Sequence, residues 1–453
     1  MKAHRWIPYA LAALCCAVYT TYSLVRHARV ETAGYDLGIF DQAVRSYAGL
    51  HAPIVSIKQP GFNLLGDHFH PILVLLVPLY WLWPSASALL FAQALLFAIS
   101  IVPVTRLALR RLGTPYGVMV GLSYGLAWGL QSALAFDFHE VAFAVPLLAF
   151  AMVALAESRW RAAALWTLPL LLVKEDMGFI VCAVGGVLLL KRQWRLGAAL
   201  IATGAAAMAL VLFVVIPYFN PAGVYPYWGR LSGADSLLQM ANEPGPKSVL
   251  LLTLLGATAF AAVRSPLLLV AVPNLLYRFM SPRPEYWGTG FVHYNAVLMP
   301  IVFVAFVDAL GLLSAARCGL LRFYARAAVP AALIVALALS VQRPLLQMTD
   351  PDFYHLDAHM IAVRDVLRLI PSGASVSAGD YLAPQLSDRC DVVLFPNLYH
   401  APVDWVVVDT TRMWVVPAPA PVQLQALQAL PSQGFHLVAA QSGIVLYHRW
   451  PVQ

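Results

Sequence analysis

Ionisable side chains gather in four short segments of the sequence, each beside an apolar run. Carboxylates, imidazoles and an amine in this combination could take a proton from a hydroxyl, bind a divalent cation or hold a phosphate. The segments are Gly34-Tyr-Asp-Leu-Gly-Ile-Phe-Asp-Gln42, with Asp36 and Asp41; Gly66-Asp-His-Phe-His-Pro71, with Asp67, His68 and His70; Phe136-Asp-Phe-His-Glu140, with Asp137, His139 and Glu140; and Lys174, Glu175 and Asp176.

Each segment also has a purely structural interpretation. Asp41 and Arg45 are four residues apart and could form an ion pair on a helix, and Asp36 could cap the helix that follows it. The two histidines of the second segment could simply precede a helix that starts at Pro71, and the remaining groups could neutralise one another. The functional hypothesis therefore depends on several segments meeting on one side of a membrane.

The segment at Lys174 is the most informative of the four. The apolar run before it, 162–173, has 12 residues, which is roughly 18 Å of helix against a hydrocarbon core of about 30 Å. The cluster should therefore lie below the headgroups, where one charge facing lipid costs about 2.5–3.5 kcal/mol. These side chains are expected to line a hydrated cavity or to pair with each other.

The composition places all four segments in a membrane protein. Of 453 residues, 60% are hydrophobic and 11% are charged, whereas soluble domains contain roughly 25% charged residues. The five cysteines are odd in number and four lie in apolar runs, so no disulfide framework is predicted. The net charge is +7, but the basic residues form short clusters between apolar runs. This pattern is typical of membrane topology signals and predicts no nucleic-acid partner.

Long apolar runs recur as far as residue 342 and predict a transmembrane domain over 1–342 with about eleven helices. The first external loop, 25–84, ends in a 13-residue apolar stretch, 72–84, that is too short to span and is expected to lie along the interface. The predicted spans are 6–24, 85–105, 115–135, 140–156, 162–173, 177–190, 196–217, 248–263, 266–280, 294–313 and 326–342.

The distribution of arginine and lysine predicts the orientation. A cytoplasmic N-terminus places the basic clusters at 106–111, 159–161, 191–195, 264 and 317–326 in the cytoplasm, as the positive-inside rule requires. The four acidic and histidine-containing segments then all face outside. An odd number of spans places the C-terminus outside the cytoplasmic membrane, and the abundance of arginine, alanine and leucine is typical of a bacterial protein from a GC-rich genome.

Residues 343–453 have the composition of a water-soluble domain. Apolar positions at helical spacing predict a helix over 355–370, and a second helix is expected over 421–430. Short β-branched runs predict strands at 375–377, 391–395, 404–409 and 443–448. Strands that alternate with helices indicate a small extracytoplasmic α/β domain.

Two further segments could contribute to a binding cleft. Residues 217–230 are rich in aromatic side chains, which could stack on sugar rings or form an interfacial belt. Arg278, Arg283 and His293 flank Glu285-Tyr-Trp-Gly-Thr-Gly and could hold a phosphate or form a structural loop. The sequence contains no phosphate-binding glycine loop, zinc-ligand spacing or serine-elbow motif, which argues against nucleotide hydrolysis and proteolysis.

The four segments, extended to Gly66-Asp-His-Phe-His-Pro-Ile-Leu and Leu172-Val-Lys-Glu-Asp, resemble the bacterial membrane family described as domain of unknown function 2079. Pro371-Ser-Gly-Ala-Ser-Val-Ser and Leu394-Phe-Pro-Asn extend the resemblance over nearly the whole chain. That family in turn is similar in layout to GT-C membrane glycosyltransferases, which use sugars carried on polyprenyl phosphate. The resemblance implies that Asp36, or less directly Asp41, is the catalytic base or a metal ligand. The paired-acid signature of some protein mannosyltransferases is absent.

The leading hypothesis is a membrane glycosyltransferase that takes a sugar from a polyprenyl-phosphate-linked donor on the outer face. Lys174, Arg278 and Arg283 are the predicted phosphate-binding residues. A divalent cation, Mg²⁺ or Mn²⁺, could bind at Asp36, Asp67, His68 and His70. Two alternatives stay open, a secondary transporter and a non-catalytic envelope scaffold. The predicted acceptor or pocket residues are Asp67, His68, His70, Asp137, His139, Glu140, Glu175, Asp176 and His293.

Overall fold

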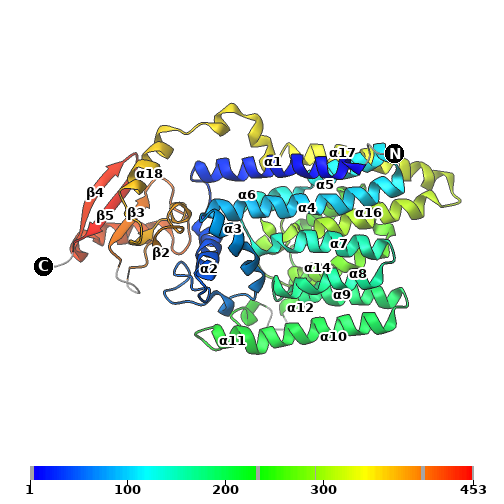
Figure 1. Cartoon of the computed structure of the whole chain (residues 1–453), viewed down its shortest axis with the longest axis horizontal. Helices are drawn as coiled ribbons and strands as arrows, with labels where there is room; N and C mark the ends of the chain where they lie inside the picture. Colours follow the sequence, from blue (N-terminus) through cyan, green and yellow to red (C-terminus); the bar gives the residue numbers. More distant parts are fainter. Residues whose placement is uncertain (1–4, 231–234, 291, 399–402, 451–453) are drawn as a thin grey trace.

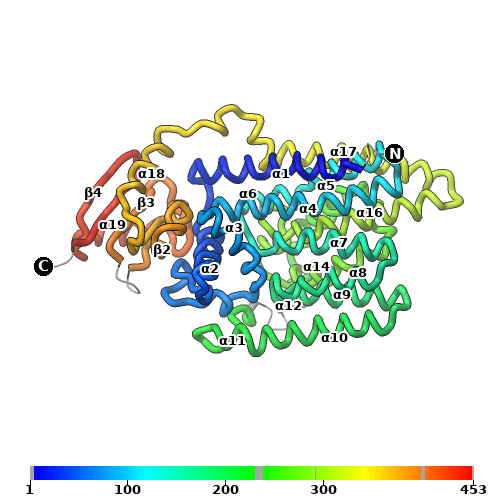
Figure 2. Tube along the Cα trace, in the orientation of Figure 1, coloured from blue at the N-terminus to red at the C-terminus, as the bar shows by residue number. Residues whose placement is uncertain are grey.

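The computed structural model describes residues 5–230, 235–290, 292–398 and 403–450. A bundle of apolar helices and a small domain with a five-stranded sheet lie end to end (Figure 1). Helix α1 (Ile7–Ala28) starts at the end of the bundle farthest from the sheet, and the chain finishes in the sheet domain, as the trace in Figure 2 shows. The fold class predicted from the sequence is confirmed.

Six helices of the described chain are long and apolar enough to cross a membrane. The segments Ala86–Leu112 and His293–Ser314 are mostly buried inside the bundle, whereas the outer helices present most of their apolar surface to the surroundings. The six are α1; α4 (Ala86–Leu112); α5 (Thr114–Gly125) with α6 (Trp128–Ala135); α10 (Trp194–Leu210) with α11 (Ile216–Phe219); α16 (Leu298–Ser314) with the turn before it; and α17 (Gly319–Ser340).

Shorter apolar helices fill the bundle between these spans. They are α7 (Ala144–Ala156), α8 (Trp160–Thr167) with the 3₁₀ turn Leu168–Leu172, α9 (Met177–Leu190), and the 3₁₀ turn Pro266–Ala271 with α14 (Val272–Phe279). The predicted span 248–263 is not one helix. Helix α13 (Pro244–Gly256) ends early, because Ala259 and Phe260 adopt left-handed backbone conformations. The hydroxyls of Thr258 and Tyr324 accommodate the end by donating to the carbonyls of Leu255 and Ala259.

The first external loop folds into short elements between the bundle and the sheet. They are the π-turn Gly34–Gly38, α2 (Ile39–Ala48), the 3₁₀ turns Leu64–Gly66 and Pro71–Leu76, and α3 (Val77–Leu82). The stretch Pro71–Leu82 is too short to span a bilayer, in agreement with the prediction of an interfacial segment. Two more short helices, α12 (Asp235–Ala241) and α15 (Pro284–Trp287), lie in later loops.

The C-terminal domain is built on a mixed sheet with strand order β2-β1-β3-β5-β4. Strand β1 pairs in parallel with β2 and β3, and β5 pairs antiparallel with β3 and β4. Helix α18 packs on the sheet face that continues into the core of the membrane part, and α19 packs on the other face. The elements are α18 (Ala358–Arg368), β1 (Ser375–Ala378), β2 (Asp391–Leu394), β3 (Trp405–Asp409), α19 (Ala420–Ala429), β4 (Phe435–Gln441) and β5 (Ile444–Arg449).

Strand β4 is not among the strands predicted from the sequence. Its side chains are mostly exposed after the buried Phe435, so no apolar alternation marks it. A signal was nevertheless present, because Ser442-Gly443 forms a two-residue turn with both residues at positive φ between β4 and β5. A Ser-Gly pair is a general turn signal.

Candidate functional site

Asp36 lines a cavity of about 410 Å³ between the first external loop and the ends of the bundle helices. Most of the polar residues predicted from the sequence line the same cavity, although they come from five separate stretches of chain. The charged and imidazole side chains of its lining are Asp36, Lys58, Asp67, His68, His70, His139, Lys174, Glu175, Asp176, Arg283 and His293.

The loop that carries Asp36 is fixed by Asp137. One carboxylate oxygen of Asp137 accepts from the backbone N–H of Ala33 at 2.9 Å, and the other accepts from the Arg26 guanidinium at 2.8 Å. Asp137 is 5% exposed and does not line the cavity. Its place is therefore behind Asp36, where it supports the loop, and not in the pocket as predicted.

Glu140 links two lining residues of the cavity, His139 and Lys174, but does not itself line it. The Lys174 amine lies 3.0 Å from one oxygen of Glu140, and Nδ1 of His139 lies 2.7 Å from the other. Gln93 on α4 holds this segment by accepting from the N–H of His139 and donating to the carbonyl of Asp137. Because Glu140 is fully buried, its charge requires these partners.

Glu175 forms the centre of a second network. Its carboxylate lies 2.6 Å from Nδ1 of His68 and accepts from the Tyr225 hydroxyl at 3.2 Å and from the Phe69 N–H at 3.2 Å. The next residue, Asp176, accepts from the Tyr277 hydroxyl at 3.0 Å. Both carboxylates thus have hydrogen-bond partners around the cavity, although the second oxygen of Asp176 is buried without one in the described chain.

Asp67 pairs with Lys58 at 2.5 Å and accepts from the Tyr227 hydroxyl, and Tyr227 stacks on His68. Although burial opposes ionisation, His68 and Lys58 hold the pKa of Asp67 well below its usual range. Burial lowers the pKa of His70 to about 4, and its ring packs edge-on against Phe40. At neutral pH the cavity therefore contains a negatively charged Asp67 and an uncharged His70.

Three residues of the described chain could hold a divalent cation together. Asp36, His139 and His293 each offer one ligand atom, and these atoms lie within 4.8 Å of one another. Both ring nitrogens of His293 are buried without a hydrogen-bond partner in the described structure, and its ring stacks on His139 with centroids 3.4 Å apart. One carboxylate and two imidazoles suit a borderline ion such as Zn²⁺.

The four metal ligands predicted from the sequence are not gathered at one point. Of these four, only Asp36 belongs to the triad formed by Asp36, His139 and His293 in the described chain. Asp67 pairs with Lys58 and His68 with Glu175, and His70 is not part of the triad. His139 and His293 replace the other predicted ligands. They come from loops 154 residues apart, and no spacing rule within one segment could have paired them.

Two further predicted site residues, Asp41 and Arg278, lie outside the cavity lining, as Asp137 and Glu140 do, and have structural partners. Asp41 is fully buried and accepts from the Ser387 hydroxyl at 2.6 Å, at the contact with the C-terminal domain. Arg45 donates to the carbonyls of Ser387 and Cys390, so the predicted Asp41–Arg45 ion pair is replaced by bonds to that domain. Arg278 is 1% exposed and is surrounded by protein acceptors.

The acceptors of Arg278 are the carbonyls of Tyr286 and Tyr294 and the side-chain oxygens of Asn274 and Asn295. Arg278 therefore fixes the loop that ends in His293. By contrast, Arg283 lines the cavity and is exposed, and it forms no ion pair within the described chain.

Several cavity residues were not singled out from the sequence. Lys58 lies in a polar loop without a distinctive motif, and the tyrosines are common residues near membrane surfaces. The spacing of Tyr225 and Tyr227 inside the aromatic segment 217–230 was the one available signal. The added lining residues with polar groups are Tyr35, Lys58, Tyr225, Tyr227, Trp228, Tyr277, Ser281, Tyr286 and Tyr294.

The fold is similar to that of a protein with solved crystal structures. The crystal structure of ArnT from Cupriavidus metallidurans bound to undecaprenyl phosphate is similar over 99% of both chains, with a TM-score of 0.60 and 14% identity. The apo state of the same protein covers 99% of this chain and 98% of its own, with a TM-score of 0.52 and 15% identity. No curated protein matches the chain in sequence.

The chain is thus a membrane protein with a GT-C-like fold, in agreement with the resemblance drawn from its motifs. The family model described as "Predicted membrane protein (DUF2079)" matches residues 26–446. The protein belongs to this family.

Proposed function

We propose that the protein is a membrane glycosyltransferase that moves a sugar from a polyprenyl-phosphate-linked donor to an acceptor hydroxyl. The observation that carries the proposal is the cavity that combines Asp36 with Lys174 and Arg283. The similarity in fold to a protein that binds undecaprenyl phosphate supports a lipid-phosphate ligand. We place the cavity at the extracytoplasmic face of a bacterial membrane and the N-terminus in the cytoplasm.

In the proposed reaction, the acceptor oxygen attacks the anomeric carbon of the donor sugar and loses its proton to Asp36. The bond between that carbon and the phosphate oxygen breaks, and polyprenyl phosphate leaves with the bonding electrons. A single displacement of this kind inverts the anomeric configuration. Burial raises the pKa of Asp36, while His139, Lys174 and Lys58 oppose the rise, and a carboxylate of raised pKa is a better proton acceptor.

The leaving phosphate gains negative charge, which a cation beside it stabilises. Arg283 fits this role better than Lys174, because Glu140 already balances the Lys174 charge. A guanidinium can also bind two phosphate oxygens at once. Lys174 lines the same cavity as a cation held in place by Glu140, next to Glu175 and Asp176.

The aromatic lining suits a sugar between these charges. Tyr225, Tyr227 and Trp228 line the cavity together with Tyr277 and Tyr286, and rings of this kind stack on apolar sugar faces. A divalent cation held by Asp36, His139 and His293 would add positive charge beside the acceptor oxygen.

The test uses the full chain purified in detergent with radiolabelled polyprenyl-phosphate sugars and measures release of polyprenyl phosphate. Asp36→Asn is expected to reduce turnover by about 10²–10⁴-fold, the usual contribution of a general base. Asp365→Asn, at an exposed site of the C-terminal domain, is the matched control and should retain full turnover. Unchanged turnover in Asp36→Asn would contradict the role of this residue.

A further inference from the structure

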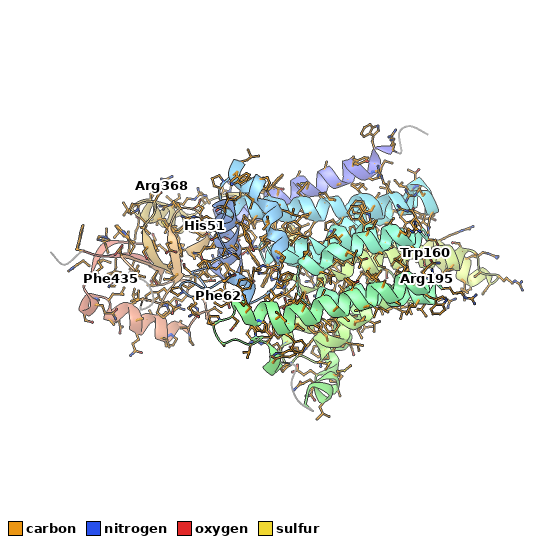
Figure 3. The ribbon with its side chains drawn as sticks, turned by 60° about the horizontal axis from the view of Figure 1, so that its bottom comes forward. His51, Phe62, Trp160, Arg195, Arg368 and Phe435 are labelled. Carbon is orange, nitrogen blue, oxygen red and sulfur yellow. The ribbon has the colours of Figure 1, made fainter. Side chains whose placement is uncertain are left out.

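A second hollow lies at the end of the helix bundle opposite the C-terminal domain. Its volume is about 750 Å³, and its lining comes from two stretches, 159–162 and 192–196. Trp160 and Arg195 mark these stretches in Figure 3, where they lie side by side at the far end of the bundle from Arg368 and Phe435. The hollow is therefore separate from the cavity around Asp36.

Four arginines surround this hollow: Arg159, Arg161, Arg192 and Arg195. No acidic residue of the described chain belongs to its lining. Arg159 is partly balanced by Glu157, which lies 2.7 Å away and also contacts Arg110.

Arg161, Arg192 and Arg195 are exposed and have no ion pair in the part of the chain that the structure describes. Three uncompensated guanidinium groups thus share one concave surface. Guanidinium groups bind phosphate oxygens through paired hydrogen bonds. The hollow therefore favours an anionic, phosphate-bearing ligand.

The backbone adds to this preference. The two stretches begin α8 and α10, and neither helix has a side-chain cap or an acidic residue in its first turn. The first intrahelical bonds run from Ala163 N to Arg159 O and from Gly197 N to Gln193 O. The N–H groups of 160–162 and 194–196 thus lack intrahelical acceptors and are available to an anion.

Two tryptophans place the hollow at the level of lipid headgroups. Trp160 and Trp194 both line it, and Trp194 is 63% exposed. Tryptophan beside arginine is characteristic of the interface between lipid chains and water. A phosphate at this depth belongs to a lipid headgroup more readily than to a soluble anion.

We infer that this hollow binds the phosphate headgroup of an anionic phospholipid at the membrane face opposite the proposed catalytic cavity. Basic pockets between transmembrane helices bind anionic headgroups in this manner. Cardiolipin matches this lining best, because it has two phosphates and each of the two stretches, 159–162 and 192–196, supplies two arginines. The site needs no glycosyltransferase activity, so its test is independent of the proposed function.

The experiment uses native mass spectrometry and thermal unfolding of the full chain in detergent. The probes are cardiolipin, phosphatidylcholine and inorganic pyrophosphate. The test variant is Arg161→Gln/Arg195→Gln. The matched control is Arg317→Gln/Arg326→Gln, which removes two exposed arginines outside the hollow, one just before α17 and one within it. Cardiolipin should bind the wild type and the control equally, and the test variant about 30-fold more weakly.

The other outcomes are equally informative. Pyrophosphate that binds as tightly as cardiolipin and displaces it would assign the hollow to a soluble phosphate compound and overturn the lipid assignment. Equal binding of phosphatidylcholine, or an equal loss in the control variant, would show that binding is non-specific. A variant with unchanged cardiolipin affinity and an unchanged unfolding midpoint would overturn the site itself.

Discussion

The carboxylate of Asp380 accepts a hydrogen bond from the backbone N–H of Tyr35 at 2.9 Å, across 345 residues of sequence. The carbonyl of Asp380 also accepts from the N–H of Gly34 at 2.8 Å. Asp380 of the C-terminal domain therefore accepts two hydrogen bonds from the turn that presents Asp36 to the cavity, and so holds this turn in place. The domain is part of the site's support, although it lines none of the cavity in the described chain.

Replacing Asp380 with alanine should loosen this turn. Loss of the carboxylate removes a partly buried hydrogen bond from the Tyr35 N–H, which is worth about 0.5–1.5 kcal/mol. We expect faster amide hydrogen exchange at residues 34–37 and about tenfold slower sugar transfer. Asp380→Asn retains an acceptor oxygen and is the matched control. Equal exchange in the alanine and asparagine variants would contradict the role of this bond.

Gly34 meets the same domain at close range. A Cβ at this position would lie 2.8 Å from the Cβ of Ala383 and 3.0 Å from the carbonyl oxygen of Asp380. Gly34→Ala should therefore destabilise docking of the domain by about 1–3 kcal/mol, the usual cost of overpacking. Limited proteolysis between the bundle and the sheet measures docking.

Ala383→Gly provides the compensating change, because it removes the nearest of these atoms. The double variant Gly34→Ala/Ala383→Gly should recover part of the lost protease resistance. A double variant that is cleaved faster than Gly34→Ala would show that the contact does not limit docking.

Much of the fold could be predicted because apolar periodicity and run length report directly on a bilayer. The run before Lys174 is an example. Its shortness predicts that the charged cluster lies below the headgroups and lines a hydrated cavity or pairs internally; in the structure Lys174 lines the cavity and contacts Glu140. Strand β4 could not be predicted, because an exposed strand carries no apolar alternation. The break in the 248–263 segment could not be predicted either, because the left-handed backbone of Ala259 and Phe260 has no compositional signature.

The candidate site was harder to predict, because tertiary contacts decide which of several similar residues line the cavity. Asp41 and Asp36 look alike in sequence, yet the Ser387 hydroxyl engages Asp41 at the domain contact. Arg278 and Arg283 are also alike, but protein carbonyls surround only the first. Pairing of His139 with His293 depends on how two loops pack, which residue spacing does not encode.

The contact with the C-terminal domain should weaken as the pH rises. Burial, together with the charge of Asp388, raises the pKa of Asp41 to about 7, against the hydrogen bonds from Ser387 and Tyr80 and the charge of Arg45. The folded chain then holds a proton that the unfolded chain releases near pH 4. This contribution to stability is present at low pH and is lost as the pH rises to about 7, by up to about 1.4 kcal/mol per pH unit.

Asp41→Asn should remove this part of the pH dependence while it keeps a partner for Ser387. Thermal unfolding of both proteins from pH 5 to pH 8 gives the comparison. We expect the midpoint of the variant to fall less steeply than that of the wild type. Parallel profiles would contradict a protonated Asp41 in the folded protein.

The triad of Asp36, His139 and His293 should bind a borderline divalent ion better than Mg²⁺, because imidazoles are poor ligands for Mg²⁺. Elemental analysis of protein dialysed against Zn²⁺ should find about one ion per chain. His293→Ala should lose this ion. His70→Ala, at a buried histidine of the same cavity outside the triad, should retain it. Equal metal content in His293→Ala and the wild type would exclude the triad as the site.

Arg283 and Arg278 should respond differently to the same substitution. Arg283→Gln removes a cation from the cavity lining, so we expect KM for the lipid-linked donor to rise by about 10–100-fold, the value of a charge-assisted bond to phosphate. Its unfolding midpoint should be unchanged. Arg278→Gln leaves the carbonyls of Tyr286 and Tyr294 without their donor and should lower the midpoint by several degrees. A donor KM that Arg283→Gln leaves unchanged would remove Arg283 from the phosphate site and leave Lys174 as its remaining candidate.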